Sequence, residues 1–422
     1  MNIEIVNTGS ELMLGRVLNT HQQWLCRRLA DLGHVVTRQV AVADSGSAIQ
    51  QAVREALGRA DLVITTGGLG PTSDDITREL IAELLGRKLV QRAEVMAHIE
   101  NFFARRGRTR PVRTEVETFV PEGAEFFLNQ FGTAPGLALR VGAAASGKTG
   151  ANQWLVMLPG PPRELRPMFD DAIVPLLKRE FATEVFVCRT LRSTGVGEST
   201  VQQMIEAGLQ PLVRRGLGVG YCARPGEVDV RLTAGGAGAA PLVREGEAVV
   251  QRILAANIFG LDDDEIENVV VRRLTELEKS LALAESCTGG NIAHRITNVP
   301  GASQVFFGGV TSYANAAKEK LLGVRGETLR QHGAVSDEVA REMAMGAREK
   351  FGSDFALAVT GIAGPAGGTT EKPVGTVFIA LASAGGVTVE RRSNPWDRAT
   401  FKDVTATQAL ELLRRRLVQG VC

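Results

Sequence analysis

Runs of β-branched and aliphatic residues alternate with amphipathic segments through the first half of the chain, and this alternation constrains the fold more than any other feature. Residues 3–7 and 61–66 are two such runs, and glycine-rich turns follow both, at Gly9 and at 67–70. Apolar residues at helical spacing occupy 19–32, which predicts a helix. Strands and helices that alternate at this spacing predict a parallel, doubly wound sheet. Because ligands bind such sheets beyond the carboxyl ends of the strands, both turns are candidate ligand sites.

The same pattern returns in the last third of the chain. Residues 280–284 read as a buried strand, 285–290 (ESCTGG) as a turn, and 291–297 as the start of a helix. A shorter region between these two parts contains strand and helix candidates but no obvious catalytic motif. We therefore expect an α/β chain with a doubly wound domain at 1–172, a small α+β domain at 173–262 and an α/β domain at 263–422.

Composition narrows the function classes. The 422 residues carry a formal net charge of +1, a balance that does not favour a nucleic-acid-binding protein. No run approaches the roughly 18 apolar residues that a membrane-spanning helix needs. Five scattered cysteines without a C-x-x-C pair disfavour both a disulfide framework and a zinc site. We therefore expect a reduced, cytoplasmic protein that contacts neither nucleic acid nor membrane directly.

Ser286 is the first candidate catalytic residue, because it lies where a buried strand meets a glycine turn. Its hydroxyl can face a crevice there, beside backbone N–H groups that stabilise an oxyanion or hold a phosphate. The alternative is that Ser286 and Thr288 cap the following helix. Cys287 is a rival nucleophile, since only one of two adjacent side chains at a strand end faces the crevice. Lys318 can act as the base if burial depresses its pKa; otherwise it is an ordinary surface lysine.

Four carboxylates accompany the N-terminal glycine turns, namely Glu11, Asp44, Asp74 and Asp75. Carboxylates beside phosphate-binding turns can hold Mg²⁺ on a pyrophosphate. Asp74 and Asp75 can equally cap a helix and complement its dipole, and the sequence alone does not choose between these interpretations.

Two further motifs have simpler interpretations. Residues 142–149 (GAAASGKT) match the P-loop pattern, but a second strand rather than a helix is predicted after them, so we expect an exposed hairpin loop. Residues 195–198 (GVGE) resemble the G-x-x-G loop of KH-type RNA-binding domains but lack flanking basic residues, and we interpret them as a turn.

Longer ordered matches cover nearly the whole chain and resemble the CinA family (competence/damage-inducible protein A). The N-terminal part is similar to the molybdopterin-binding domain of molybdenum-cofactor biosynthesis proteins, and the middle region is similar to the KH-like insert of the family. The C-terminal part resembles nicotinamide-nucleotide amidase. The segments that carry the resemblance are 8–12 (TGSEL), 66–72 (TGGLGPT), 132–136 (GTAPG), 158–162 (LPGPP), 284–290 (AESCTGG), 311–318 (TSYANAAK), 332–336 (HGAVS) and 360–365 (TGIAGP).

The resemblance implies that the C-terminal domain hydrolyses the carboxamide of nicotinamide mononucleotide (NMN) to nicotinate mononucleotide and ammonia without a cofactor. It implies Ser286 as nucleophile, Lys318 as base and Tyr313 as a proton relay or oxyanion donor. The implied substrate-binding residues are Thr288, Gly289, Gly290, Asn315, Thr360, Gly361, Gly364 and Arg398. The family often has G-D-R-x-x-x-R at the start of the last helix, where this chain has Trp396 for the glycine and Lys402 for the second arginine.

For the N-terminal domain the resemblance implies cleavage of ADP-ribose to AMP and ribose 5-phosphate with a divalent metal such as Mg²⁺. The implied site comprises Gly9, Glu11, Gly67, Gly68, Gly70, Thr72, Asp74 and Asp75, with Asp74 and Asp75 as metal ligands. Two alternatives stay open: a pterin- or nucleotide-binding module without catalysis, and an interaction partner of competence or DNA-repair proteins. A homo-oligomer is compatible with each of them.

Overall fold

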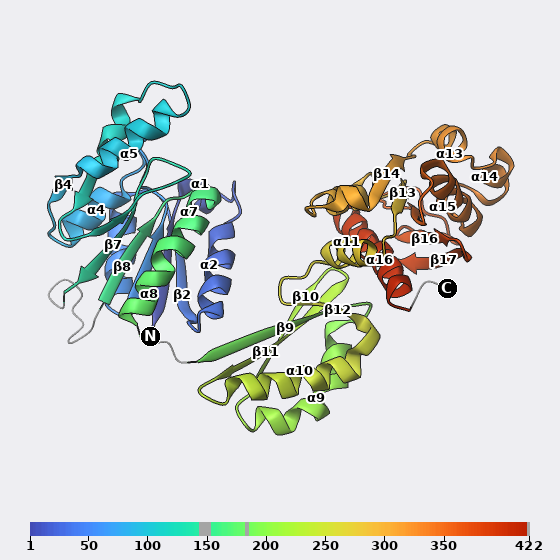
Figure 1. Cartoon of the computed structure of the whole chain (residues 1–422), viewed down its shortest axis with the longest axis horizontal. Helices are drawn as coiled ribbons and strands as arrows, with labels where there is room; N and C mark the ends of the chain where they lie inside the picture. Colours follow the sequence, from blue (N-terminus) through green and yellow to red (C-terminus); the bar gives the residue numbers. More distant parts are fainter. Residues whose placement is uncertain (143–152, 182–184, 420–422) are drawn as a thin grey trace. The chain divides into compact units, whose positions relative to one another are not determined.

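Two compact units make up the chain in the computed structural model, which describes residues 1–142, 153–181 and 185–419. The first unit holds Met1–Val187 with Gly235–Ala237, and the second begins with Cys188–Ala234 and continues from Gly238. Figure 1 labels the elements of both units. The hairpin loop expected at 142–149 lies, apart from Gly142, outside the described residues.

A six-stranded sheet forms the centre of the first unit, in the order β2-β1-β3-β8-β7-β6. Four strands, β2, β1, β3 and β8, run parallel as the sequence predicts, whereas β7 and β6 are antiparallel to their neighbours. The antiparallel pairing of β7 and β8 agrees with the two strands expected on either side of residues 142–149, since a hairpin joins antiparallel strands. The strands are β1 (Ile3–Thr8), β2 (Val36–Val42), β3 (Leu62–Thr66), β6 (Glu125–Phe127), β7 (Gly136–Val141) and β8 (Gln153–Leu158).

Helices cover both faces of this sheet, which confirms the doubly wound architecture. One face carries α2 (Thr20–Asp31), α7 (Pro162–Met168) and α8 (Val174–Glu180). The other carries α3 (Gly46–Leu57), α4 (Thr77–Leu84) and α5 (Ala93–Ala104). The shorter elements are α1 (Ser10–Met13), β4 (Leu89–Gln91), η1 (Val112–Thr118), β5 (Phe119–Pro121) and η2 (Phe169–Ile173).

The first domain extends further along the chain than the sequence predicts. Ile173, Leu176 and Leu177 are buried in the same core as Ile3 and Leu25. The expected boundary at 172 is therefore wrong, because α8 completes the hydrophobic core of the N-terminal sheet, and the boundary lies beyond Glu180.

The second unit begins with a four-stranded sheet in the order β10-β11-β9-β12, accompanied by two helices that pack on each other. Its strands are β9 (Phe186–Thr194), β10 (Gly218–Arg224), β11 (Glu227–Gly235) and β12 (Ile258–Leu261). Its helices are α9 (Glu198–Val213), α10 (Ala239–Leu254) and the short η3 (Ala255–Asn257).

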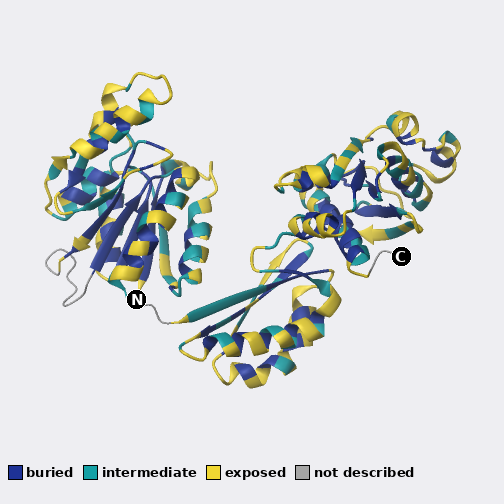
Figure 2. Cartoon of the chain, viewed as in Figure 1, coloured by how far each residue is buried: buried dark blue, intermediate teal, exposed yellow. Residues whose placement is uncertain are grey.

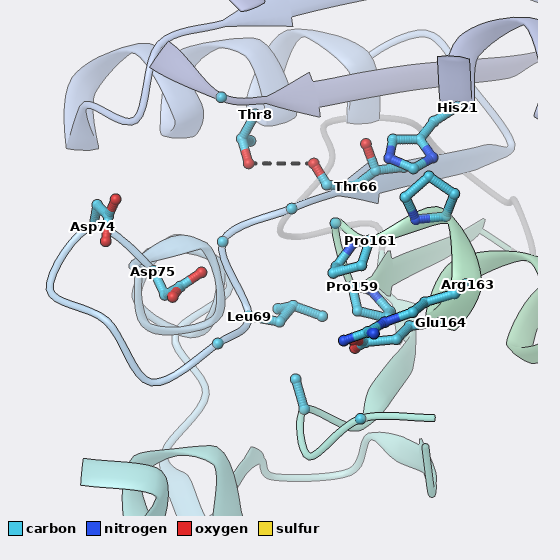
Figure 3. A pocket seen from close by; sticks show the side chains of 18 of the residues that line it. Thr8, His21, Thr66, Leu69, Asp74, Asp75, Pro159, Pro161, Arg163 and Glu164 are labelled. Atoms are coloured by element: carbon cyan, nitrogen blue, oxygen red, sulfur yellow. Dashed lines mark hydrogen bonds and ion pairs between the residues drawn. The ribbon is translucent and has the colours of Figure 1, made fainter. Parts of the chain in front are cut away.

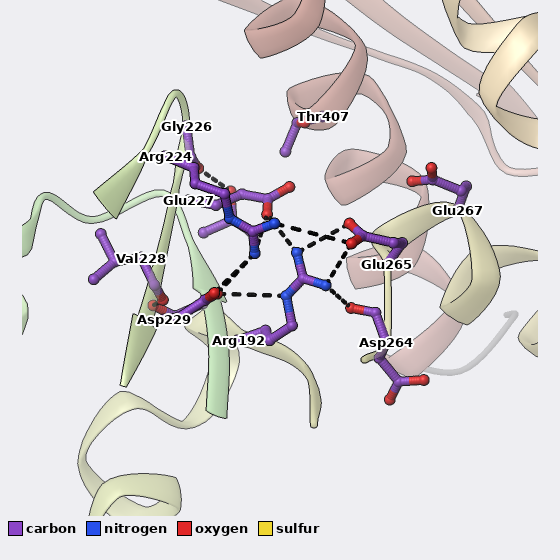
Figure 4. A network of polar contacts seen from close by, with 12 residues as sticks. Arg192, Arg224, Gly226, Glu227, Val228, Asp229, Asp264, Glu265, Glu267 and Thr407 are labelled. Atoms are coloured by element: carbon purple, nitrogen blue, oxygen red, sulfur yellow. Dashed lines mark hydrogen bonds and ion pairs between the residues drawn. The ribbon is translucent and has the colours of Figure 1, made fainter. Parts of the chain in front are cut away.

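An ion network joins this small sheet to the start of the C-terminal part (Figure 4). Arg192 of β9 is buried, and its guanidinium lies 3.0 Å from the Glu227 carboxylate and 3.4 Å from that of Asp229. The same guanidinium lies 2.8 Å from the carboxylate of Glu265, the residue that precedes α11 (Ile266–Glu276). Arg224 also contacts Asp229, at 2.9 Å. These contacts tie the middle sheet to α11.

The C-terminal part contains a five-stranded sheet in the order β14-β13-β15-β16-β17. The first three strands are parallel and the last two antiparallel. They are β13 (Leu281–Glu285), β14 (Phe306–Thr311), β15 (Phe355–Gly361), β16 (Thr376–Ser383) and β17 (Gly386–Ser393). β13 is buried along its whole length, as Figure 2 shows for the strands at the centre of this sheet.

Helices cover both faces of this sheet as well. α11, α12 (Asn291–Thr297) and α16 (Arg398–Val418) pack on one face, and α13 (Asn315–Leu322), α14 (Gly326–His332) and α15 (Asp337–Phe351) on the other. A short η4 (Ala302–Gln304) precedes β14. Within the described ranges, no helix is long and apolar enough to cross a bilayer.

Candidate functional site

Ser286 and Lys318 meet at the carboxyl end of the parallel strands in the C-terminal sheet. Ser286 directly follows β13, and its backbone N–H donates to the carbonyl of Val359 on β15. The Lys318 ammonium on α13 donates a hydrogen bond to the Ser286 hydroxyl over 3.0 Å. The two residues that the sequence offers as nucleophile and base are therefore in direct contact.

The burial of Lys318 lowers the pKa of its amine. The side chain is 1% exposed. Its other partners are backbone carbonyls, of Ser312 at 2.7 Å and Tyr313 at 3.4 Å. In the described part of the chain no carboxylate forms an ion pair with this ammonium. An amine in this position is suited to accept a proton from Ser286.

Cys287 points away from this contact, into the hydrophobic core. It is 5% exposed and belongs to the cluster that contains Ile292 and Leu283. Burial raises the pKa of the Cys287 thiol to about 12, and a protonated thiol is a poor nucleophile. The geometry favours Ser286 over Cys287.

Glu285 caps the helix after the turn, a role that the sequence offered to Ser286 and Thr288 as an alternative to catalysis. Its buried carboxylate accepts hydrogen bonds from the Thr288 hydroxyl at 2.7 Å and from the backbone N–H groups of Gly290, Ile292 and Ala293 at 3.0, 3.1 and 2.8 Å. A carboxylate at a helix N-terminus satisfies free N–H groups and complements the dipole. The Ser286 side chain is thereby left free to contact Lys318.

This cap engages two groups that the resemblance implies as substrate contacts. The Thr288 hydroxyl and the Gly290 N–H both donate to Glu285, and the Gly289 N–H donates to the Ser286 carbonyl at 3.2 Å. These three groups shape the turn. The N–H groups of Cys287 and Thr288 have no backbone acceptor among the described residues and lie beside the Cys287 sulfur, so they are the candidates for stabilising an oxyanion.

A cationic residue from α16 reaches the other side of the turn. Arg398 donates to the carbonyl of Gly364 at 3.0 Å and to the hydroxyl of Tyr313 at 2.6 Å. The Tyr313 side chain is 62% exposed, so its hydroxyl contacts Arg398 while its carbonyl contacts Lys318. The Tyr313 hydroxyl, which the resemblance implies as a proton relay or oxyanion donor, therefore accepts a hydrogen bond from Arg398 in this structure.

Lys402 lies beside the nucleophile turn, although it replaces the expected arginine. A Cβ placed on Gly289 would lie 3.7 Å from the Lys402 ammonium. Trp396, the other departure, is 54% exposed. Two cations from the first turns of α16, Arg398 and Lys402, thus flank the turn that carries Ser286.

Two of the remaining expected residues, Thr360 and Gly361, have structural contacts. The Thr360 hydroxyl is buried and donates to the Ala334 carbonyl at 2.7 Å. A Cβ on Gly361 would lie 2.8 Å from the Thr376 carbonyl, so the close approach of β15 and β16 requires glycine there. Asn315 is exposed at the first position of α13. Thr360 and Gly361 therefore have structural roles, and their contact with a substrate stays a prediction.

A pocket of about 640 Å³ occupies the carboxyl ends of β1 and β3 in the first unit (Figure 3). This volume lies within the range of small-molecule sites. Both glycine turns line it, as the sequence predicts. The lining includes Gly9, Glu11, Asp44, Gly67, Gly68, Gly70, Asp74 and Asp75. Thr72 lies in the same loop but does not line the pocket.

Among the described residues, the two glycine turns differ in whether their glycine N–H groups already have acceptors. The N–H of Gly9 donates to Val42 and that of Gly67 to Leu158. The N–H groups of Gly68, Leu69 and Gly70 have no acceptor among the described residues. Gly68 has a φ of +68°, and a Cβ there would collide with the Thr77 side chain at 2.0 Å. The segment 68–70 is therefore the candidate phosphate-binding turn.

The carboxylates in this pocket have structural partners. Asp75 accepts from the backbone N–H of Thr72 at 3.0 Å and from its hydroxyl, and Asp44 accepts from the Ser10 N–H at 2.7 Å. No group of three or more His, Cys, Asp or Glu side chains in the described residues could hold a metal ion. Asp74 and Asp75 fit a Mg²⁺ ion only together with phosphate oxygens and water, a common arrangement for this ion.

Sequence reasoning missed two ionisable groups that line the pocket. His21, in the first turn of α2, lies near Thr66 and Pro161 in Figure 3, and burial lowers its pKa. Glu117 is fully buried; one carboxylate oxygen accepts from Thr133 at 3.0 Å, and the other has no hydrogen-bond partner among the described residues. Burial raises the pKa of Glu117 to about 7. Neither residue lies in a glycine turn or a motif, so the sequence carried no signal for them.

Three family models match the chain, one for each of its parts. They are "Probable molybdopterin binding domain" at residues 4–179, "Damage-inducible protein CinA KH domain" at 188–260 and "CinA C-terminal domain" at 263–417. A CinA-like protein of Akkermansia muciniphila is 42% identical over 411 residues, which cover 97% of this chain and 96% of that protein.

The chain belongs to the CinA family.

Further members are similar over their full lengths or in part. A CinA-like protein of Syntrophomonas wolfei is 39% identical over 421 residues, 99% of each chain. The crystal structure of a competence/damage inducible protein from Agrobacterium tumefaciens is 42% identical and covers 36% of this chain and 94% of its own, with a TM-score of 0.34. The CinA resemblance expected from the sequence is confirmed.

Proposed function

We propose that the C-terminal domain of this CinA protein is an amidohydrolase that converts NMN to nicotinate mononucleotide and ammonia. The contact between Ser286 and the buried Lys318, which forms no ion pair with any described residue, carries this proposal. A serine hydroxyl hydrogen-bonded to an amine of lowered pKa is the arrangement of a Ser-Lys nucleophile and base.

A residue of this site can perform each proton transfer of the reaction. Lys318 takes the proton as the Ser286 oxygen attacks the amide carbon, and the backbone N–H groups of Cys287 and Thr288 stabilise the oxyanion. Lys318 then gives the proton to the leaving nitrogen, so that ammonia departs and an acyl-enzyme remains. Water attacks the ester as Lys318 takes its proton, and the return of that proton to Ser286 releases the acid.

Charge at the start of α16 supports a phosphorylated substrate. Arg398 and Lys402 flank the Ser286 turn and no ion pair neutralises either side chain within the described residues. Lysine binds phosphate as a point charge, whereas arginine binds it bidentately. A nucleotide amide matches this combination better than a neutral amide.

Ammonia release from NMN by the full chain tests this proposal. We expect activity in the wild type and in Cys287→Ala, and none in Ser286→Ala. Retention of activity in Ser286→Ala, or its loss in Cys287→Ala with the fold intact, would assign the nucleophile to Cys287 instead.

For the N-terminal pocket we propose metal-dependent hydrolysis of ADP-ribose to AMP and ribose 5-phosphate. The free N–H groups of 68–70 and the pocket volume support a phosphorylated ligand. A divalent cation would screen the charge of the pyrophosphate, with Asp74 and Asp75 as its protein ligands. We expect AMP release to require Mg²⁺ and to be lost in Asp74→Asn.

The alternatives make different predictions in the same assays. Tight AMP binding without turnover would indicate a non-catalytic nucleotide- or pterin-binding module. A folded chain that turned over neither nucleotide yet bound a competence or DNA-repair protein would indicate an interaction role.

A further inference from the structure

Three phenylalanines line the N-terminal pocket beside its polar turns. They are Phe102 and Phe103, in the last turn of α5, and Phe131, in the loop before β7. Phe131 is 47% exposed. An aromatic side chain that stays exposed forgoes the stabilising free energy of burial. The position of Phe131 at the pocket therefore points to contact with a ligand rather than with the core.

Hydrogen bonds hold α5 and the Phe131 loop together. The His98 Nε2 atom lies 2.8 Å from the Asn129 carbonyl and 3.4 Å from that of Gly132. Phe102 follows His98 by four residues, so both side chains project from the same face of α5. The phenylalanines of α5 and of the loop therefore form one apolar wall, defined here as Phe102, Phe103 and Phe131.

One member of this wall already has a cationic partner. The Arg106 guanidinium lies 3.5 Å from the centre of the Phe102 ring, and the Phe103 ring meets Phe102 edge to face at 5.8 Å. One face of Phe102 is thus covered by a cation. Phe103 and Phe131 are left as the rings that can meet a ligand.

The loop that carries Phe131 is anchored on both sides. The Phe131 N–H donates to the Asn129 side chain at 3.0 Å, and Asn129 donates to the Glu164 carboxylate at 2.8 Å. Thr133 donates to Glu117 at 3.0 Å. A wall held in place before the ligand arrives reduces the entropy lost on binding.

Further apolar side chains come from the loop between α1 and α2. Val17 and Leu18 line the same pocket and are 55% and 85% exposed. The pocket therefore combines free backbone donors at 68–70 with aromatic and aliphatic side chains. A ligand that matches both kinds of surface carries a phosphate and a flat apolar-faced ring.

We propose that the wall of Phe102, Phe103 and Phe131 is a stacking subsite for the base of a nucleotide whose phosphate binds at 68–70. This inference rests on the proposed function of the pocket and adds the residues that select a nucleotide over a sugar phosphate. Phe131 and Phe103 stack on the ring of the base, while the phosphate oxygens accept hydrogen bonds from the backbone N–H groups of Gly68, Leu69 and Gly70.

Binding of AMP and of ribose 5-phosphate to the full chain, by calorimetry with Mg²⁺, tests the inference. We expect wild-type protein to bind AMP more tightly than ribose 5-phosphate. Phe131→Ala should weaken AMP binding by about tenfold, a usual loss for one base–aromatic stack, and leave ribose 5-phosphate binding unchanged. Phe131→Tyr, which keeps a ring, should retain the wild-type affinity for AMP. Val112→Ala, exposed outside the pocket, is the control.

The outcomes separate this inference from the proposed function. Equal weakening of AMP and ribose 5-phosphate in Phe131→Ala would show a structural effect and overturn the stacking subsite. Hydrolysis of ADP-ribose with an unchanged KM in both Phe131→Ala and Phe103→Ala would overturn it while the proposed hydrolase stood. No binding of AMP or ADP-ribose by the wild type would overturn both.

Discussion

The Lys318 ammonium lies 3.0 Å from the Ser286 hydroxyl although 32 residues separate them in the chain. Parallel pairing of β13 and β14 brings them together, because both strands end at the same edge of the sheet. Lys318 sits in the first turn or two of α13, shortly after β14, and Ser286 directly follows β13. The contact is a consequence of topology rather than of a local motif.

Amidase activity should rise with pH through the lowered pKa of Lys318. The amine accepts a proton only when it is neutral, so activity is lost as pH falls below that pKa, which burial holds below its usual 10.5. Lys318→Met should lower kcat/KM for NMN by about 10²–10⁴-fold and remove the acid limb of the profile. The pH dependence of ammonia release measures both. Lys320→Met, an exposed neighbour on α13, is the matched control; an unchanged profile in Lys318→Met would exclude Lys318 as the base.

The Glu285 cap should contribute measurably to stability. Glu285→Gln replaces one acceptor oxygen by a donor that faces backbone N–H groups, which leaves buried donors unpaired. We expect the free energy of unfolding to fall by about 1–3 kcal/mol, measured by urea denaturation. Glu371→Gln changes an exposed carboxylate and should have almost no effect. Equal stability of the two variants would contradict the cap.

Glu117 should make the first unit less stable as pH rises. Its folded pKa is about 7 against an ordinary 4.5, so its contribution to stability is fully present below 4.5 and is lost as pH rises through 7. The penalty for ionising the buried group is up to about 3 kcal/mol at pH 8. Glu117→Gln, which stays neutral, should therefore gain stability relative to wild type between pH 5 and pH 8. Urea denaturation at pH 5 and pH 8 measures this gain, with the exposed Glu115→Gln as control. A difference in unfolding free energy between Glu117→Gln and wild type that is the same at both pH values would show that the pKa of Glu117 is not raised.

The buried guanidinium of Arg192 should contribute far more to the free energy of unfolding than an exposed guanidinium does. Arg192→Met removes the buried guanidinium that Glu227, Asp229 and Glu265 share and leaves them with the more exposed Arg224. Removal of one side of a buried ion pair costs about 3–5 kcal/mol. Arg215→Met removes an exposed pair with Glu245 and should cost about 1 kcal/mol or less. Thermal unfolding of the two variants compares them directly, and similar midpoints would argue against a structural role for the network.

Much of the fold was predictable because periodicity reports local structure. The helix expected at 19–32 is α2 (Thr20–Asp31), and the strand expected at 3–7 is β1 (Ile3–Thr8). Strand β6, its antiparallel pairing with β7 and the N-terminal role of α8 were not predictable in this way. Strand direction and domain membership depend on which distant segments share a core, and single-segment patterns do not record that.

The candidate sites were likewise predictable in part. Glycine turns after strands predicted where both sites lie, and Ser286 and Lys318 were named from their motifs. The hydrogen-bond partners of Thr288 and Thr360 could not be predicted from the sequence, because their hydroxyls meet Glu285 and the Ala334 carbonyl only in the folded chain. Glu117 and His21 escaped notice because their burial, which shifts their pKa values, is a property of the packed domain.

The sequence by itself determined the α/β class, the order of the elements, the family and the turns at which ligands would bind, since these follow from hydrophobic periodicity, from glycine and from long ordered matches. The tertiary structure decided which of the candidates meet. Lys318 rather than a histidine contacts Ser286, Cys287 faces the core, and Glu285 caps α12. Contacts between segments far apart in the chain, and the desolvation that accompanies them, exist only once the sheets are assembled.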